Sequence, residues 1–165
     1  MSVVDFAENY SLQLQNEIQS HNYHLEQVII IVHITNRNGP DSIEENQVIL
    51  KEINFYISDD RTHNFHYVQH YFQLFYDWLI AGGIPFCQHW IWLDGCVGKF
   101  KDACVFQWLS LLHIKYNVIH LWSYFETEHR KRMHDGGGAC IKITLWREQM
   151  KFTGTNLCDA QSIVK

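Results

Sequence analysis

Long apolar runs are missing from this 165-residue chain, so no segment is predicted to span a bilayer and no membrane partner is expected. The first residues, Met1-Ser2-Val3-Val4-Asp5, lack the charged and apolar regions of a signal peptide. CxxC pairs are also missing, and the five cysteines are odd in number and irregularly spaced. Reduced thiols in an intracellular protein are therefore expected rather than a disulfide framework.

Internal repeats, low-complexity tracts and linkers are absent as well, which favours a single domain over residues 1–165. Hydrophobic residues make up 47% of the chain and aromatic residues 15%, enough for a globular core. We expect most of the tryptophans to lie in that core rather than to stack on bases, namely Trp90, Trp92, Trp108, Trp122 and Trp146.

Basic residues are scarce in the first part of the chain and enriched in the second. Residues 1–95 hold 3 Lys/Arg against 12 Asp/Glu, and residues 96–165 hold 10 against 6, for a net charge of −5. The net charge argues against a nucleic-acid partner, whereas the positive second half could face phosphates. The alternative is an ordinary solvated charged face. The candidate phosphate contacts are Lys99, Lys101, Arg130, Lys131, Arg132, Lys142 and Arg147.

Apolar periodicity predicts five strands and three helices. The strands are expected at Val3–Phe6, Val28–Ile34, Gln47–Ser58, His89–Leu93 and Val118–Phe125. The helices are expected at Asn64–Ala81, from Gly98 to Tyr116, and at Ala139–Lys151, with a further short helix open within residues 11–26 and a loop over 126–138. The inward helix positions are predicted to be Phe65, Val68, Phe72, Phe75 and Leu79, then Phe100, Cys104, Trp108, Leu111 and Leu112, then Ile141, Leu145 and Trp146.

The resulting order, β-β-β-α-β-α-β-α, predicts an α/β fold with a mixed five-stranded sheet and helices on its faces. It is the order of the ribonuclease H-like fold, in which the first and fourth strands are neighbours. Asp5 lies on the first of these strands and Asp94 follows the fourth, so we expect them to meet despite their separation in sequence.

Three aspartates could hold divalent metal ions. Asp5 and Asp94 end apolar runs, and Asp135 precedes a run of three glycines and a predicted helix. Hard carboxylate oxygens suit Mg²⁺ or Mn²⁺, and two bridged ions can stabilise the attacking and leaving oxygens of a phosphoryl transfer. Asp-Gly turns and a helix N-cap are the alternative interpretation.

Histidines and cysteines offer two further possibilities. His129 and His134 flank the basic run 130–132, where a histidine could assist proton transfer or simply lie on a loop surface. The basic run is also a weak nuclear-localisation signal, and we expect a nuclear protein. Zinc binding by Cys87, His89, Cys96 and Cys104 is the weaker alternative, because their spacing matches no finger pattern.

Several motifs together resemble a known family. They are Asp5–Tyr10, Trp92-Leu93-Asp94-Gly95-Cys96 with Phe100-Lys101, Phe125–His129, and His134–Lys142. The segment from Asp5 to about Met150 is similar to transposon-derived, transposase-like proteins of plants and invertebrates. The resemblance implies a ribonuclease H-like DDE/DDD core that cuts and joins transposon DNA with Mg²⁺ or Mn²⁺. It also implies Asp5, Asp94 and Asp135 as the catalytic metal ligands and His129 as the motif histidine.

The sequence departs from the family pattern in two places. Leu93 stands where the family has a serine, and residues 130 and 132 are arginines where the family has glycines. Relatives carry an upstream DNA-binding region, so we expect a fragment that lacks it. A homo-oligomer stays open, and Glu128 is the alternative third ligand.

The leading functional hypothesis is a transposase- or integrase-like core that performs DNA strand transfer, active or inactivated. The alternatives are a domesticated, non-catalytic module that binds DNA or protein, and a nuclease acting on RNA or RNA–DNA hybrids.

Overall fold

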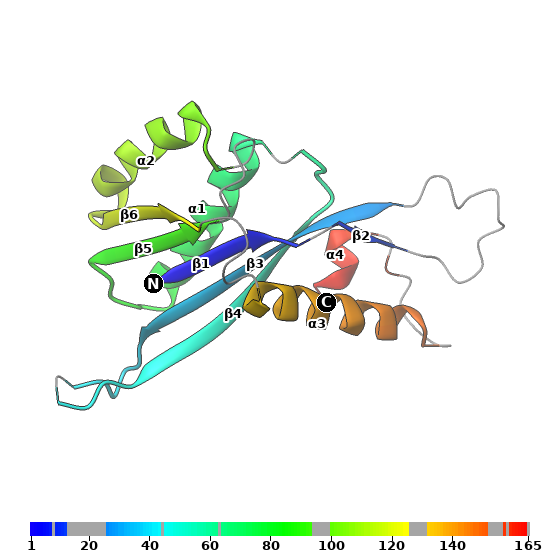
Figure 1. Ribbon diagram of the computed structural model, residues 1–165, viewed down its shortest axis with the longest axis horizontal. Helices are drawn as coiled ribbons and strands as arrows, with labels where there is room; N and C mark the ends of the chain where they lie inside the picture. Colours follow the sequence, from blue (N-terminus) through cyan, green and yellow to red (C-terminus); the bar gives the residue numbers. More distant parts are fainter. Residues whose placement is uncertain are drawn as a thin grey trace. The chain divides into compact units, whose positions relative to one another are not determined.

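The computed structural model describes residues 1–7, 9–12, 26–43, 45–62, 64–93, 100–125, 132–151, 157 and 159–164. Its strands are β1 (Ser2–Phe6), β2 (Tyr10–Ser11), β3 (Gln27–Asn38), β4 (Ile49–Ser58), β5 (Gln88–Leu93) and β6 (Ile119–Tyr124) (Figure 1). Its helices are α1 (Phe65–Ala81), α2 (Ala103–Tyr116), α3 (Arg132–Gln149) and α4 (Ala160–Ile163).

The strands form a six-stranded mixed sheet in the order β2-β3-β1-β5-β6, with β4 paired to β3. The pairs β1–β5 and β5–β6 are parallel, whereas β2 and β3 are antiparallel. The predicted mixed α/β class is thus confirmed, and so is the neighbourhood of the first strand and the strand at His89–Leu93. The strand β2 was not predicted, and the ribonuclease H-like assignment stays a prediction.

The chain divides into two compact units, each assembled from separate segments. Unit 1 comprises Met1–Val4, Ile34–Glu52 and Thr62–Arg130, and unit 2 comprises Asp5–His33, Ile53–Arg61 and Lys131–Lys165. Because β1, β3 and β4 each contribute residues to both units, the backbone passes between the units along these strands.

In unit 1, α1 forms as its sequence predicts. The side chain of Asn64 caps its start by accepting a hydrogen bond from the Tyr67 backbone N–H at 3.1 Å. Gly83 follows its end with φ +61°, a left-handed conformation that favours glycine. The predicted inward residues Val68, Phe72, Phe75 and Leu79 are all buried, and Phe65 is half-buried.

The helix α2 buries less of its surface than predicted. Only Val105 and Leu112 are buried within it, whereas Cys104 is exposed and Leu111 is 54% exposed. The prediction of Cys104 and Leu111 as core residues is therefore wrong. Apolar residues occur all around this helix, so periodicity alone does not define an inward face. Trp108 does turn inward, with its ring 5.9 Å from that of Phe72.

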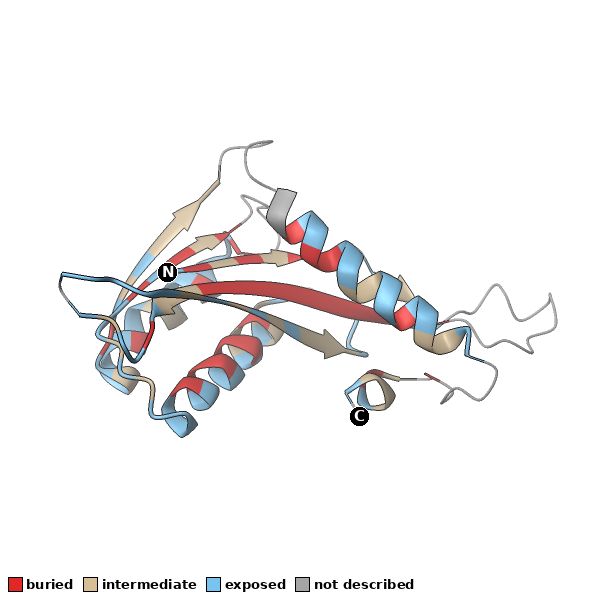
Figure 2. Ribbon diagram, turned by 90° about the horizontal axis from the view of Figure 1, so that it is seen from below, coloured by how far each residue is buried: buried red, intermediate tan, exposed pale blue. Residues whose placement is uncertain are grey.

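In unit 2, one face of β3 packs against α3 and α4. Residues 28–33 of β3 are fully buried, which Figure 2 shows as a continuous buried ribbon. The core cluster joins residues of β3 to the C-terminal segments: Leu12, Val28, Ile30, Leu145, Leu157 and Ala160.

The start of α3 differs from the prediction. The helix begins at Arg132, so the predicted loop over 126–138 is wrong for residues 132–138. Each glycine is about 1 kcal/mol less favourable than alanine in a helix, so three consecutive glycines predict a loop. A Cβ on Gly137 would lie 3.1 Å from Val32 Cγ1, and one on Gly138 would lie 3.3 Å from the Cβ of Ala7. Two of the three glycines therefore allow the helix to approach the strands closely.

Two of the expected core tryptophans lie at the surface. Trp90 is 49% exposed and Trp146 is 54% exposed, so their assignment to the core is wrong. Trp90 alternates with buried neighbours along β5, and Trp146 follows the buried Leu145 on α3, so each side chain points away from its unit's core.

Candidate functional site

Asp5 lies on β1 and is half-buried. The preceding residue, Val4, is level with Leu93 in the parallel β1–β5 pair. Leu93 itself is fully buried. Asp94 directly follows Leu93 but lies outside the described residues, so the predicted meeting of Asp5 and Asp94 stays a prediction.

The helix α3 lies on the face of β1 that carries Asp5. Ala7, which directly follows β1 and lies next to Gly138, continues the pairing with β3 through its backbone N–H, so it shares a face with Asp5 two residues earlier. The strand β1 runs antiparallel to β3, because the Ala7 backbone N–H donates to Ile30 and the Asn36 backbone N–H donates to Met1. The helix α3 thus packs on the strand face that carries Asp5, one of the predicted metal ligands.

The direction of α3 brings Asp135 toward the same end of unit 2 as Asp5. Gly137 packs on Val32, and Leu145, further along α3, belongs to the cluster with Val28 and Ile30. The helix therefore runs antiparallel to β3 and parallel to β1. Asp135 precedes Gly138 by roughly 4.5 Å of helix rise, and Asp5 precedes Ala7 by roughly 7 Å of strand. Asp135 is exposed in the first turn of α3.

Among the described residues, no group of three His, Cys, Asp or Glu side chains is placed to hold a metal ion. The predicted triad is not tested by that finding, because Asp94 is not described. His129 and the alternative ligand Glu128 also lie outside the described residues.

The candidate phosphate contacts are described only in part. Lys101 is exposed, and its Nζ lies 4.6 Å from the centroid of the Tyr124 ring. Lys142 is half-buried and Arg147 is exposed, both on α3, which begins at Arg132. Lys99, Arg130 and Lys131 lie outside the described residues.

His134 is a core residue rather than part of a loop surface. It is 6% exposed on the inward side of α3. In the same unit His33 is fully buried, and burial, with a smaller electrostatic influence from the nearby His134, lowers the pKa of His33 to about 3. His33 is consequently neutral at physiological pH.

The cysteines do not support a zinc site in the described part of the chain. Cys87, Cys104 and Cys140 are free, exposed thiols, and the reduced state of the chain stays a prediction. Of the four candidate zinc ligands, Cys96 lies outside the described residues, and the other three are not grouped around a metal position.

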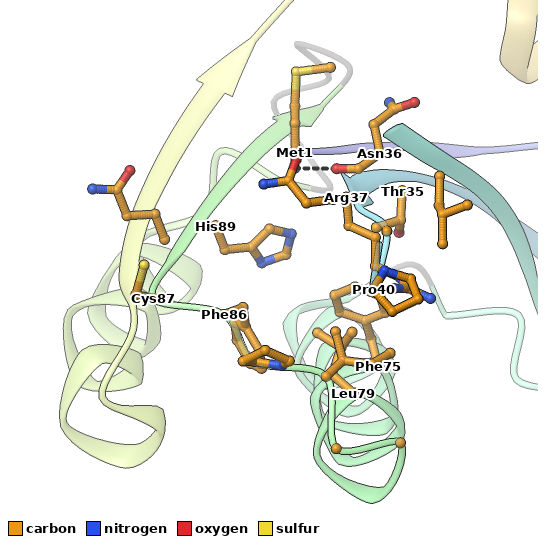
Figure 3. A pocket seen from close by; sticks show the side chains of 18 residues that line it. Met1, Thr35, Asn36, Arg37, Pro40, Phe75, Leu79, Phe86, Cys87 and His89 are labelled. Atoms are coloured by element: carbon orange, nitrogen blue, oxygen red, sulfur yellow. Dashed lines mark hydrogen bonds between the residues drawn. The ribbon is translucent and has the colours of Figure 1, made fainter. Parts of the chain in front are cut away.

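Unit 1 contains a pocket of about 880 Å³ that was not predicted (Figure 3). It lies between the β3–β4 hairpin, the end of α1 and the connection from α1 to β5. Its residues are far apart in sequence, so no local motif marks it. The lining includes Met1, Thr35, Arg37, Leu50, Phe75, Leu79, Ile84, Phe86 and His89.

His89 connects the pocket wall to a buried hydrogen-bonded network. Its Nδ1 lies 2.9 Å from the Tyr76 hydroxyl, and its Nε2 lies 2.7 Å from Ser2 Oγ. All three residues are buried. The buried network fixes the imidazole ring and occupies both of its nitrogens. No pattern in the sequence marks His89 as buried; its burial between exposed neighbours is visible only in the structure of β5.

The fold defines a mixed α/β protein with a six-stranded sheet, two of whose strand pairs are parallel. More specifically, the chain belongs to the family described as a domain of unknown function, DUF8701, whose model matches residues 1–165. Comparisons with curated proteins and with solved structures give no match. Within the described part of the chain, no helix is both long and apolar enough to cross a membrane.

Proposed function

We propose that this chain is a transposase-type, ribonuclease H-like core that binds two Mg²⁺ or Mn²⁺ ions with Asp5, Asp94 and Asp135. The proposed reaction is hydrolysis of a phosphodiester bond followed by DNA strand transfer. The metal ions would supply Lewis-acid stabilisation of the attacking and leaving oxygens when bound.

The observation that carries the proposal is the packing of α3. Gly138 lies against Ala7 on the face of β1 that holds Asp5, and α3 runs parallel to β1. Asp5 and Asp135 therefore lie on adjacent elements of one unit. Each comes shortly before the contact of its own element with the other, and the two elements run in the same direction. Val4 and Leu93 lie opposite each other in the parallel β1–β5 pair, and each immediately precedes a proposed ligand. This pairing supports Asp94 as the third metal ligand.

The proposed DNA contacts are Lys99, Lys101, Arg130, Lys131, Arg132 and Lys142, with His129 near the scissile phosphate. These residues come from the positively charged part of the sequence, where 10 Lys/Arg face 6 Asp/Glu in residues 96–165. Contacts with transposon or target DNA would place the protein in the nucleus, and their strength would fall as the salt concentration rises.

Metal-dependent thermal stabilisation tests the proposed centre. At a Mn²⁺ concentration 100-fold above Kd, the melting temperature of the wild type should rise by about 5–10 °C, because only the folded state gathers the carboxylates. Asp5→Asn, Asp94→Asn and Asp135→Asn should each remove most of the rise. Asp77→Asn, on the exposed side of α1, is the matched control and should retain it. A wild type without any rise at millimolar Mn²⁺ would contradict the proposal.

A non-catalytic binding module is the second candidate, and Leu93 favours it. This side chain is fully buried where the resembled family has a serine. Nicking of supercoiled DNA with Mn²⁺ separates the candidates. Nicking by the wild type that Asp94→Asn abolishes supports catalysis, whereas retained DNA binding without nicking supports the module. Cleavage of an RNA–DNA hybrid but not of duplex DNA would support a hybrid nuclease instead.

A further inference from the structure

We propose that the pocket in unit 1 binds a neutral amphiphilic molecule of drug-like size: an apolar body that carries a hydroxyl or carbonyl group. The pocket contains none of the aspartates of the proposed metal centre. This second site is therefore independent of the proposed function, and either proposal can fail alone.

The size and walls of the pocket define the apolar body. Its volume of about 880 Å³ falls in the range of small-molecule sites, about 300–1,000 Å³. The walls come from Phe75 and Leu79 on α1, from Ile84 and Phe86 beyond its end, and from Leu50 on β4. Phe75 and Leu79 are 1% and 5% exposed, so the back wall belongs to the core of the unit and is preformed.

Thr35 supplies the polar contact. It is 5% exposed, it lines the pocket, and its buried Oγ1 has no hydrogen-bond partner among the described residues (Figure 3). Buried hydroxyls are almost always hydrogen-bonded, so an unpartnered one beside a cavity indicates a partner that enters the cavity. A hydroxyl can donate as well as accept, and it therefore fits a ligand with either a hydroxyl or a carbonyl group.

Among the described residues that line the pocket, Arg37 has the one charged side chain, and it is already paired, which favours a neutral ligand. Arg37 donates from Nε and Nη2 to both carboxylate oxygens of Glu52, at 2.7 and 2.9 Å. The ring nitrogens of His89 are occupied as well, so this residue offers its apolar ring surface. A carboxylate or phosphate would find no unpaired cationic side chain in the described lining of the pocket.

Phenol and toluene form a matched pair of probes, because they differ by a hydroxyl in place of a methyl group. Titrations followed by amide chemical shifts should give saturable changes at the pocket residues with both probes. Thr35→Val should weaken phenol binding about five-fold, the usual worth of one hydrogen bond, and should change toluene binding less than two-fold. The exposed Thr62 provides the control substitution, Thr62→Val, which should change neither affinity.

The melting temperature of Thr35→Val and the probe affinity of a second variant, Ile84→Trp, provide two further tests. Thr35→Val should melt at or above the wild-type temperature, because it removes an unpartnered buried hydroxyl and keeps a β-branched residue on the strand. Ile84 is half-buried in the pocket lining, and Ile84→Trp should fill part of the pocket and weaken binding of both probes at least ten-fold. The proposal is overturned if neither probe shifts the pocket amides of the wild type at millimolar concentration. It is overturned equally if Thr35→Val leaves phenol binding unchanged or weakens both probes alike.

Discussion

His33 combines full burial with a titratable ring, and this combination makes the stability of the protein depend on pH. Its pKa is about 3 in the folded state, against about 6.5 when unfolded, so the unfolded chain takes up the proton first. The contribution of His33 is therefore fully present above pH 6.5 and is lost as the pH falls toward 3. The expected slope is about 1.4 kcal/mol per pH unit within that window.

Urea unfolding at pH 6.5 and pH 4.5 measures this effect. From pH 6.5 to pH 4.5, the decrease in the free energy of unfolding should be about 2–3 kcal/mol smaller in His33→Asn than in the wild type. Comparing the changes with pH removes the effect of the substitution on stability itself. His70→Gln, on the exposed side of α1, should keep the wild-type pH dependence. Equal pH dependence in His33→Asn and the wild type would show that another group is responsible.

Among the helices, α3 offers a direct comparison of neighbouring glycines. A Cβ on Gly136 would meet nothing within 4 Å, whereas one on Gly137 would lie 3.1 Å from Val32 Cγ1. Gly136→Ala should stabilise the protein by about 0.5–1 kcal/mol through helix propensity alone. Gly137→Val should destabilise it by about 1–3 kcal/mol through overpacking against a buried strand.

Chemical denaturation of these two variants and of Gly136→Val gives the test. Gly136→Val carries the same side chain into open space and so separates the helix propensity of valine from the contact with Val32. If Gly137→Val were as stable as Gly136→Val, the close approach of α3 to β3 would be wrong.

The elements also show what the sequence could reveal. The prediction of α1 was accurate, because an apolar stripe on one side of a helix leaves only one face that can turn inward: Val68, Phe72, Phe75 and Leu79. The start of α3 was missed, because helix propensity does not include the packing that compensates for glycine. For the site, strand order was enough to predict that β1 and β5 are neighbours. The pocket was not predictable, because Thr35, Phe75 and Phe86 converge only through tertiary structure.

At the scale of the whole molecule, unit 2 depends on its C-terminal segment. Leu157 is 5% exposed in the cluster with Val28 and Ile30, and the Ala160 backbone N–H donates to Asp59 Oδ1 at 2.7 Å. Leu157→Ala should cost about 2–4 kcal/mol through a cavity and lost burial. Val164→Ala, at a residue that is 75% exposed, should cost almost nothing.

Hydrogen exchange locates the effect of Leu157→Ala. Amides of β2 and of the first half of β3 should lose more protection than those of β5 and β6, because only the former belong to unit 2. Equal losses throughout the chain would mean that the two units open together.

The interleaving of the two units also has a consequence for synthesis. The last segment of unit 1 ends at Arg130, whereas unit 2 still requires Lys131–Lys165. At ribosomal speeds of about 5–20 residues per second, that segment takes roughly 2–7 s to emerge. During this interval the apolar side of β3 that carries Val28 and Ile30 has no α3 or α4 to cover it. A nascent chain paused at this point is the form of the protein that a chaperone would bind.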